Sequence, residues 1–200
     1  MVSRDKTEQV KQQVIEAADQ LFYQKGYNLA SFSDIAAASK VPRGNLNYHF
    51  NTKSEVLVAV IKYRVTEMQK MLRSWESEYK TPLERLQRYA QIVSNVEKEV
   101  IHYGCPMGTL NSELGKVQHD LKAVTKEQFD VFEQWIKKQF QLMGCNKNAA
   151  ELTMHLMVLT QGVATMAYIH QDTRFIKREA KSIANWLASL TCKTNSTDSL

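Results

Sequence analysis

Residues 14–57 read VIEAADQLFYQKGYNLASFSDIAAASKVPRGNLNYHFNTKSEVL, and this stretch decides the fold. It opens within an apolar stripe at helical spacing, formed by Val10, Val14, Ala17, Ala18, Leu21 and Phe22. The stripe predicts a helix over about residues 6–25, and Gly26 suits the left-handed residue that ends such a helix.

Two shorter helices follow in the same stretch. Ser31 and Asp34 stand in the order of a capping box, which predicts a helix over about 31–39, and Pro42 suits the start of a third helix over about 43–50. Two short helices joined by a turn of about four residues are typical of a helix-turn-helix, in which the second helix enters the major groove of DNA. Spacing alone fits a generic three-helix subdomain with solvated polar residues equally well.

Outward from this stretch the chain continues as amphipathic helices. Apolar periodicity and cap signals predict helices over about 52–79, 82–103, 118–143, 149–170 and 173–190. Residues 104–115 (GCPMGTLNSELG) hold three of the seven Gly and one of the three Pro, which predicts a kink or a short, irregular helix.

Composition supports an all-α fold of about nine helices. Seven Gly and three Pro stand against the roughly 14 and 10 that average usage would place in 200 residues. Proteins built of many short strands need more turn residues than this. We expect a DNA-binding domain over 1–51, a ligand-sensing and dimerisation domain over 52–190, and a disordered tail over 191–200.

The cellular setting is expected to be the cytoplasm. The N-terminus lacks the apolar segment of a signal peptide, and no apolar run of about 18 residues is free of polar interruption. Cys105, Cys145 and Cys192 are widely spaced and form no CxxC pair, which predicts a reducing compartment and no disulfide framework. Residues 1–80 carry 12 Lys and Arg against 9 Asp and Glu, a mild positive excess that suits a polyanionic partner.

The residues from Val14 to Leu57 resemble the DNA-binding domain of the TetR family of transcriptional repressors. The positions that carry the resemblance are Ala17, Ala18, Leu21, Phe22, Gly26, Tyr27, Ser31, Asp34, Ile35, Ala36, Val41, Gly44, Leu46, His49, Phe50, Lys53 and Leu57. The remaining chain resembles the family in length and helix count. The resemblance implies a cytoplasmic bacterial repressor whose homodimer binds a palindromic operator of double-stranded DNA.

Carried over position by position, the resemblance implies which side chains touch DNA. The candidates are Ser31, Ser33, Lys40, Arg43, Asn45, Asn47, Tyr48, His49 and Lys53. Arg43 and Asn45 are candidates for base edges, whereas Ser31, Tyr48, His49 and Lys53 are candidates for phosphates. Asn47 stands where the family commonly has Tyr and brings an amide able to read adenine. Lys40 replaces the usual turn Gly, at a cost on the order of 1 kcal/mol for left-handed geometry.

The C-terminal helices are expected to hold the dimer interface and the inducer. The helix over 149–170 is apolar almost all round, so we expect it to be buried by its own domain and by a partner chain together with the last helix. Gly162, Ala164 and Ala167 would allow close helix approach. The candidates for contact with a small apolar or aromatic inducer are Cys105, Met107, Asn111, Phe132, Trp135, Met157 and Gln161, although most such residues are also suited to plain core.

Cys105 has three possible roles. It lies between Gly104 and Pro106 at a predicted helix start, where the helix dipole favours the thiolate. The segment 104–115 is similar to the G-C-x-x-G-N-L stretch of the TetR branch that responds to electrophiles and oxidants, with Thr109 and Leu110 in place of Asn and Leu. Cys105 could therefore sense electrophiles, line the pocket or simply pack.

Catalysis, cofactors and metals are not expected. The sequence holds no Ser/His/Asp order, phosphate-binding Gly loop or HExxH, and His102 with Cys105 lacks the second pair that a zinc site needs. The alternative function is a helical ligand-binding or interaction module that no longer reads DNA. Steep salt dependence of binding to a palindromic duplex would separate the two.

Overall fold

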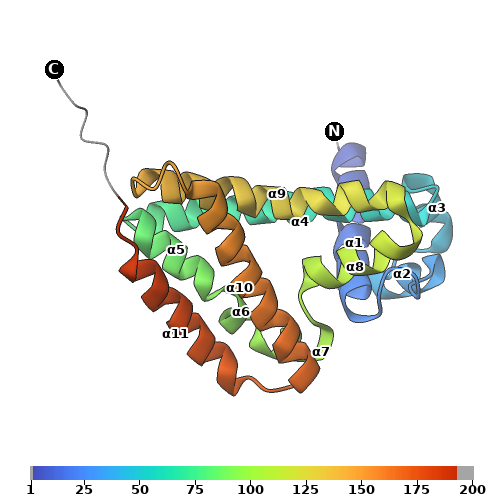
Figure 1. Ribbon diagram of the computed structural model, residues 1–200. Coiled ribbons are helices and arrows are strands. Elements are labelled where there is room, and N and C mark those ends of the chain that lie inside the picture. Colours follow the sequence, from blue (N-terminus) through green and yellow to red (C-terminus); the bar gives the residue numbers. More distant parts are fainter. Residues whose placement is uncertain (1, 193–200) are drawn as a thin grey trace. The chain divides into compact units, whose positions relative to one another are not determined.

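The computed structural model describes residues 2–192, and all regular structure in that range is helical (Figure 1). The helices are α1 (Val2–Gln24), α2 (Phe32–Ser39), α3 (Arg43–His49), α4 (Lys53–Glu78), α5 (Pro82–Ala90), α6 (Ile92–Asn95), α7 (Glu97–Tyr103), α8 (Pro106–Val117), α9 (His119–Leu142), α10 (Ala149–His170) and α11 (Arg174–Ser189). The predicted all-α fold is confirmed. The predicted disordered tail lies outside the described residues from 193 onward.

The chain forms two compact units, and their limits differ from the boundary expected at residues 51 and 52. The first unit comprises the residues up to Met68 together with Pro106–Gln128, and the second comprises Gln69–Cys105 together with the residues from Phe129 onward. Helix α8 and the first part of α9 therefore belong to the same unit as the helix-turn-helix, although they lie far from it in sequence.

The first unit folds around one apolar core supplied by α1 to α4 and α8. Its fully buried members include Val14, Ala18, Ile35, Leu46, Leu57, Ile61 and Leu114. Leu110 and Leu114 of α8 lie four residues apart, on one face of that helix, and both join this core. Burial of large aliphatic side chains on this scale, at roughly 1.5–3 kcal/mol each, fixes the unit's tertiary structure.

The second unit contains α5, α6, α7, α10 and α11, together with the last part of α4 and the part of α9 from Phe129 onward. Helix α10 packs against α7 and α11, and α11 packs against α5. Fully buried Tyr89 contacts Phe132 edge to face, with ring centroids 5.2 Å apart, and its hydroxyl lies 3.4 Å from Thr160 Oγ1. Burial raises the pKa of Tyr89 to about 12, so the phenol stays protonated.

One helix expected over 82–103 is divided into α5, α6 and α7. Thr81 and Glu84 form the predicted capping box and Pro82 occupies the first turn, so the start is as predicted. The breaks fall at Gln91 and Val96, whose N–H groups bond to carbonyls three residues back, at Arg88 and Val93. These tighter turns interrupt the α-helical ladder.

Two predicted caps are only partly formed. Thr52 Oγ1 accepts from the Glu55 N–H at 3.1 Å, but the Glu55 carboxylate accepts from the Asn51 N–H rather than from Thr52. Asn148 is the N-cap of α10, but its side chain makes no capping hydrogen bond.

The prediction of no disulfide is wrong for two of the three cysteines. Cys145, in the turn after α9, is joined to Cys192, just after α11, with Cα atoms 4.8 Å apart. Gly144 (φ 89°) lies in the turn that ends α9, and Cys145 follows it directly. Cys105 is half-buried and keeps its thiol.

Helix α10 is long and apolar enough to cross a membrane by length and composition, and about a third of its most apolar stretch is buried within the chain. Its hydroxyl groups at Thr153 and Thr160 donate to carbonyls of the preceding turn. Ala164 and Ala167 are buried in a cluster with Val93, Val100 and Ile176 of the same chain, so they are not available for the expected close approach of a partner helix. Gly162, in contrast, is exposed, and a Cβ there would meet nothing within 4 Å.

Candidate DNA-binding interface

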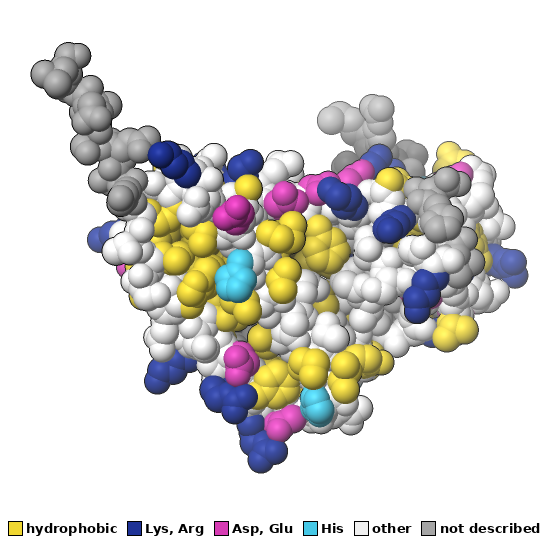
Figure 2. Space-filling model, viewed as in Figure 1, with side chains coloured by type: hydrophobic (Ala, Val, Ile, Leu, Met, Phe, Trp, Pro, Cys, Tyr) yellow, Lys and Arg dark blue, Asp and Glu magenta, His cyan; other side chains and the backbone are white. Residues whose placement is uncertain are grey.

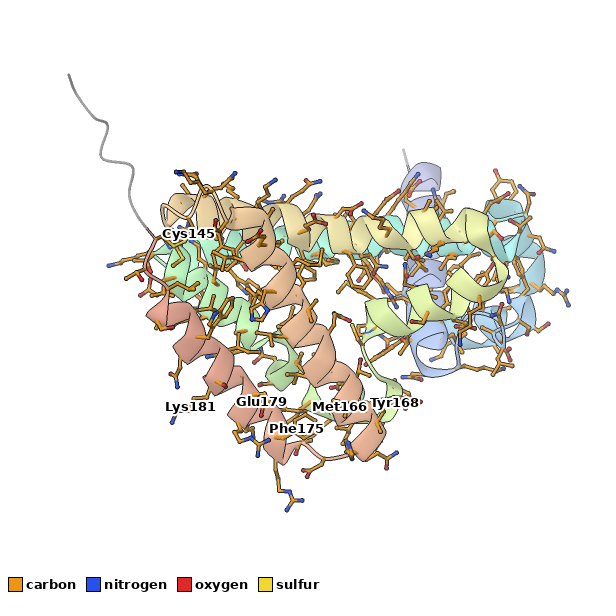
Figure 3. The ribbon with its side chains drawn as sticks, in the orientation of Figure 1. Cys145, Met166, Tyr168, Phe175, Glu179 and Lys181 are labelled. Atoms are coloured by element: carbon orange, nitrogen blue, oxygen red, sulfur yellow. A yellow bond between two sulfur atoms is a disulfide. The ribbon has the colours of Figure 1, made fainter. Side chains whose placement is uncertain are left out.

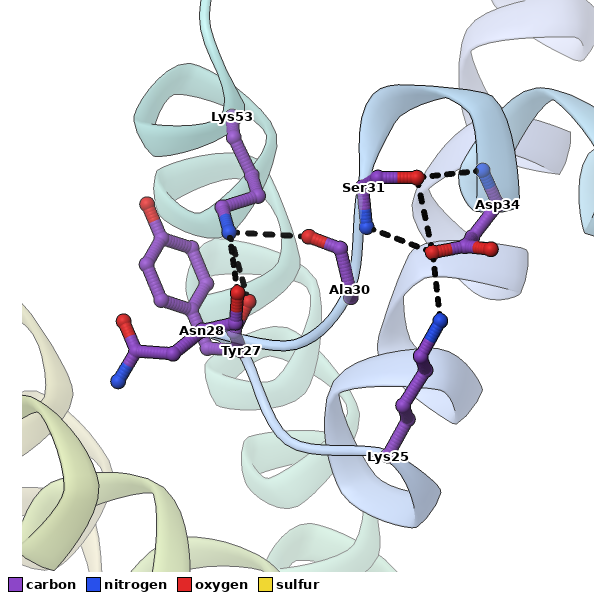
Figure 4. Close-up of polar contacts among 7 residues, drawn as sticks. All are labelled: Lys25, Tyr27, Asn28, Ala30, Ser31, Asp34 and Lys53. Atoms are coloured by element: carbon purple, nitrogen blue, oxygen red, sulfur yellow. Dashed lines mark hydrogen bonds and ion pairs between the residues drawn. The ribbon is translucent and has the colours of Figure 1, made fainter.

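The start of α2 is fixed by a complete capping box (Figure 4). Ser31 Oγ accepts from the Asp34 N–H at 3.1 Å, and the Asp34 carboxylate accepts from the Ser31 N–H and hydroxyl, both at 2.8 Å. Lys25 Nζ adds an ion pair to the same carboxylate at 2.7 Å. The hydrogen bond from Lys25, followed by those from Ser31, lowers the pKa of Asp34 to about 2. Ser31 is exposed but its polar groups contact Asp34.

The turn between α2 and α3 has the predicted left-handed residue. Lys40 has φ 55° and ψ 24° and caps α2, and the N–H groups of Lys40 and Val41 bond to the carbonyls of Ala37 and Ala36. Pro42 then begins α3, and its carbonyl accepts from Asn45 and Leu46. This bonding sets the angle at which α3 leaves α2.

Helix α3 has one buried residue and a broad exposed face. Leu46 is fully buried in the core of the first unit. The exposed positions are Arg43, Gly44, Asn45, Asn47 and Tyr48. Tyr48 is 82% exposed, a large fraction for an aromatic ring, and it contacts half-buried His49 edge to face. This short helix is held by one apolar residue and presents amide, guanidinium and phenol groups. Such groups are suited to hydrogen bonds with base edges and phosphates of DNA.

Two of the predicted DNA contacts touch each other. Arg43 Nη1 donates to Ser33 Oγ at 3.3 Å, which joins the first turns of α3 and α2 on the exposed side. Lys40 lies at the turn beside them and is also exposed. These residues bring two cationic side chains to the end of α2 and the start of α3, where they suit phosphate or guanine.

Lys53, a predicted phosphate contact, lies further inside than expected. Its ammonium donates to the carbonyls of Tyr27, Asn28 and Ala30 at 2.8, 3.3 and 2.9 Å, and it lies 4.4 Å from the centroid of the Tyr27 ring (Figure 4). Partial burial lowers its pKa. In this structure Lys53 holds the loop between α1 and α2.

The predicted inducer contacts fall into two groups. Met107 and Asn111 belong to the first unit, whereas Cys105, Phe132, Trp135, Met157 and Gln161 belong to the second. Asn111 Nδ2 donates to Thr125 Oγ1 at 2.9 Å, and Trp135 Nε1 donates to Glu76 Oε1 at 3.1 Å. Phe132, Trp135 and Met157 are buried, whereas Cys105, Met107 and Gln161 are half-buried.

Sequence reasoning missed two groups of polar residues. Glu113 of α8 bonds to the loop after α1, and Tyr89 forms a buried pair with Thr160. Both pairings join residues more than 70 positions apart, so no local sequence pattern could predict them. Among the described residues, no group of three or more His, Cys, Asp or Glu side chains could hold a metal ion.

Comparison with known proteins assigns the family. Residues 14–60 match the bacterial regulatory proteins of the TetR family, and residues 82–182 match the C-terminal domain of LmrA/YxaF-like transcriptional regulators. The chain therefore belongs to the TetR family of bacterial transcriptional regulators.

Individual relatives agree with this assignment. The chain is 33% identical over 121 residues to an uncharacterised helix-turn-helix regulator encoded in the lacX 3′ region of Lactococcus lactis, a match that covers 60% of this chain and 62% of that protein. It is 31% identical over 130 residues to the repressor DhaR of a Mycobacterium species, covering 64% and 62%. The matched part spans about three fifths of these relatives.

Solved structures share the fold at lower identity. A TetR regulator from Chloroflexus aurantiacus has a TM-score of 0.80 at 18% identity, over 92% of this chain and 97% of that one. Reduced NemR of Escherichia coli has a TM-score of 0.74 at 16% identity, over 88% and 96%.

Proposed function

We propose that the chain is a cytoplasmic repressor whose homodimer binds a palindromic operator and leaves it when an inducer binds or an electrophile reacts. The observation that carries the proposal is the exposed face of α3, where every residue from Arg43 to Tyr48 except Leu46 is open to solvent. The relative from Mycobacterium is named a repressor, which supports repression rather than activation of transcription.

On DNA, α3 lies in the major groove with Arg43 and Asn45 toward base edges. Asn47 adds an amide that suits adenine, and Tyr48 and His49 face phosphates together with Lys40. Ser33 supports Arg43, while Ser31 and Lys53 contribute through the cap and the loop that place α2.

The operator test uses DNA from upstream of the chain's own gene in fluorescence anisotropy over a range of salt. We expect tight binding that weakens steeply with salt, because each neutralised phosphate releases counterions. Arg43→Ala should lower affinity roughly 5- to 150-fold, as loss of a base contact worth about 1–3 kcal/mol does. Arg73→Ala, a change of the same charge at an exposed position of α4 in the second unit, is the control. Absence of salt-dependent binding favours the alternative, a ligand-binding or interaction module.

The homodimer is proposed to form through α10 and α11. Hydrophobic side chains gather along α10 in the space-filling view (Figure 2), and the large ones that are exposed are Met154, Val158, Met166, Tyr168 and Ile169. Val158 is 59% exposed near the middle of this set. Met166 and Tyr168 belong to the last part of α10 and Phe175 to the first turn of α11 (Figure 3), and these two helices pack against each other. A second copy of the chain would cover this surface, and two copies would supply the two recognition helices that a palindrome needs.

Sedimentation tests the dimer. Val158→Glu should shift the protein to monomer at micromolar concentration, because burial of an unpaired carboxylate opposes association. Gln141→Glu, at an exposed position of α9 in the same unit and outside α10 and α11, controls for the one added negative charge. A wild-type monomer at this concentration contradicts the proposal.

The inducer is proposed to act near the start of α8. Cys105 is the residue before α8, and Gly104 before it adopts φ 77°. After burial, the charge of Cys105 adds to the rise in the pKa of Tyr89. A small apolar or aromatic molecule would alter the first turn of α8. So would a quinone to whose ring carbon the Cys105 sulfur adds, the thiol proton passing to the quinone. Cys105→Ser with unchanged release from DNA by a quinone rules out the covalent route and leaves the non-covalent inducer.

A further inference from the structure

Helix α8 belongs to one domain by sequence and to the other by contact. The match to the C-terminal regulator domain runs over residues 82–182 and so includes α8. In the structure, however, Pro106–Gln128 pack into the compact unit of the helix-turn-helix. A conformational change that moves α8 would therefore act on a helix that packs with the DNA-binding helices.

The contact between α8 and the DNA-binding domain centres on one carboxylate. Glu113 Oε1 accepts from the Asn28 N–H at 2.7 Å, and Glu113 Oε2 accepts from the Tyr27 N–H at 3.0 Å. Gly26, with φ 88°, turns these two amides toward α8, and a Cβ at Gly26 would lie only 3.2 Å from a Glu113 oxygen. Gln118 adds a hydrogen bond to Asn28 Oδ1 at 3.2 Å.

Lys53 holds the carbonyls of the same loop. Its ammonium donates to the carbonyls of Tyr27, Asn28 and Ala30. Glu113 accepts from the N–H groups of Tyr27 and Asn28, so both the carbonyls and the amides of the loop are bonded. Ser31, the N-cap of α2, follows immediately after Ala30. The position of α2, and through the Lys40 turn that of α3, therefore depends on this loop.

A second bond fixes the start of α8. Arg64 of α4 donates from Nη1 to the Pro106 carbonyl at 3.1 Å while its Nε pairs with Asp19 of α1. The start of α8, beside Cys105, and its middle at Glu113 are thus both attached to the DNA-binding unit. Leu110 lies between these two attachments and Leu114 directly after the second, and both pack into the core of the unit.

We propose that Glu113 is a positioning residue for DNA binding: its carboxylate holds the Tyr27–Asn28 amides and so sets the placement of α2 and α3 on the operator. This inference rests on the proposed function for its DNA-bound state, but the loop contact itself can be tested without DNA. Movement of α8 by inducer would withdraw the carboxylate and loosen the loop.

The experiment compares Glu113→Ala, Glu113→Gln and wild type as full-length protein. Glu127→Ala is the matched control, because Glu127 is an exposed carboxylate of α9 within the same compact unit. The first readout is amide hydrogen exchange in peptides that cover residues 26–31 and 32–49. The second is operator affinity at a temperature where circular dichroism shows every variant folded.

We expect exchange over 26–31 to rise at least tenfold in Glu113→Ala and operator affinity to fall at least fivefold. Glu113→Gln should be intermediate, because one amide oxygen can still accept from Asn28, and Glu127→Ala should match wild type. Faster loop exchange with wild-type affinity would overturn the positioning role and leave Glu113 purely structural. Unchanged loop exchange would overturn the contact itself. A wild-type protein that fails to bind any operator would instead refute the proposed function, and the exchange data would still decide the contact.

Discussion

Lys25 Nζ lies 2.7 Å from Asp34 Oδ2, and this ion pair joins the end of α1 to the first turn of α2. Asp34 is at the same time the capping residue that binds Ser31. One carboxylate thus fixes both the start of α2 and its position beside α1, next to the predicted DNA contacts.

The ion pair predicts how the cap responds to acid. The pKa of Asp34 is lowered from 3.8 to about 2 by Lys25 first and Ser31 second. A carboxyl group with a depressed folded-state pKa stabilises the fold above its unfolded pKa, and this contribution is lost as pH falls from about 3.8 toward about 2. NMR titration of the Asp34 carboxyl carbon should therefore show it still ionised at pH 3. Lys25→Met should move the midpoint up toward 3.8. A wild-type midpoint close to 3.8 would contradict the bonding described here.

Replacing Gly44 with Ala should raise the stability of the fold and lower its affinity for DNA. A Cβ at this exposed position of α3 would meet nothing within 4 Å, so the fold itself does not require glycine. Gly44→Ala should raise the free energy of unfolding by up to about 1 kcal/mol through helix propensity. It should lower operator affinity, because the methyl group would lie between α3 and the DNA backbone.

Gly115→Ala on α8 is the matched control for this change. A Cβ at Gly115 would make ordinary contact with the Lys122 side chain at 3.6 Å, away from α3. Chemical denaturation should show a similar gain in stability, and anisotropy should show wild-type operator affinity. If Gly44→Ala binds the operator as tightly as Gly115→Ala does, DNA does not approach α3 at Gly44.

Local patterns predicted the DNA-binding helices well because their determinants are near in sequence. The Ser31–Asp34 box, the left-handed Lys40 and the left-handed Gly26 all act within one turn of their own position. The sequence could not predict that Glu113 bonds to Asn28, because the pairing joins residues 85 positions apart. The position of a single carboxylate on a helix does not indicate which distant residue it will bond to.

The faces of α10 show a different limit. Because the helix is apolar almost all round, periodicity could not tell which small residues face the chain's own core, and Ala164 and Ala167 were assigned to the partner side. The disulfide was missed for a similar reason, since Cys145 and Cys192 are brought together only by the path of α10 and α11.

The Cys145–Cys192 pair predicts a redox-dependent stability. Oxidised glutathione should convert the two thiols to the disulfide and release two reduced glutathiones. Closing a loop with a sequence separation of 47 residues should stabilise the fold by about 4 kcal/mol in the chain-entropy estimate. Alkylation of the unfolded protein followed by mass spectrometry should label Cys105 alone after oxidation, and all three cysteines after reduction. Labelling of all three after oxidation would contradict the pairing.

The exposed Gly162 of α10 predicts where two α10 helices cross in the proposed dimer. It lies between Val158 and Met166 on the uncovered apolar side of the helix, and the space beside its Cα is open. Glycine at such a point lets a partner backbone approach closely, whereas a large side chain would separate the helices. Gly162→Leu should therefore weaken dimerisation at least tenfold in sedimentation equilibrium. Gly162→Ala, which adds only a methyl group, should weaken it much less while raising the free energy of unfolding of the chain by up to about 1 kcal/mol. A Gly162→Leu variant that dimerises as tightly as wild type would place the crossing elsewhere on α10, because its added isobutyl group would then have met no partner atom.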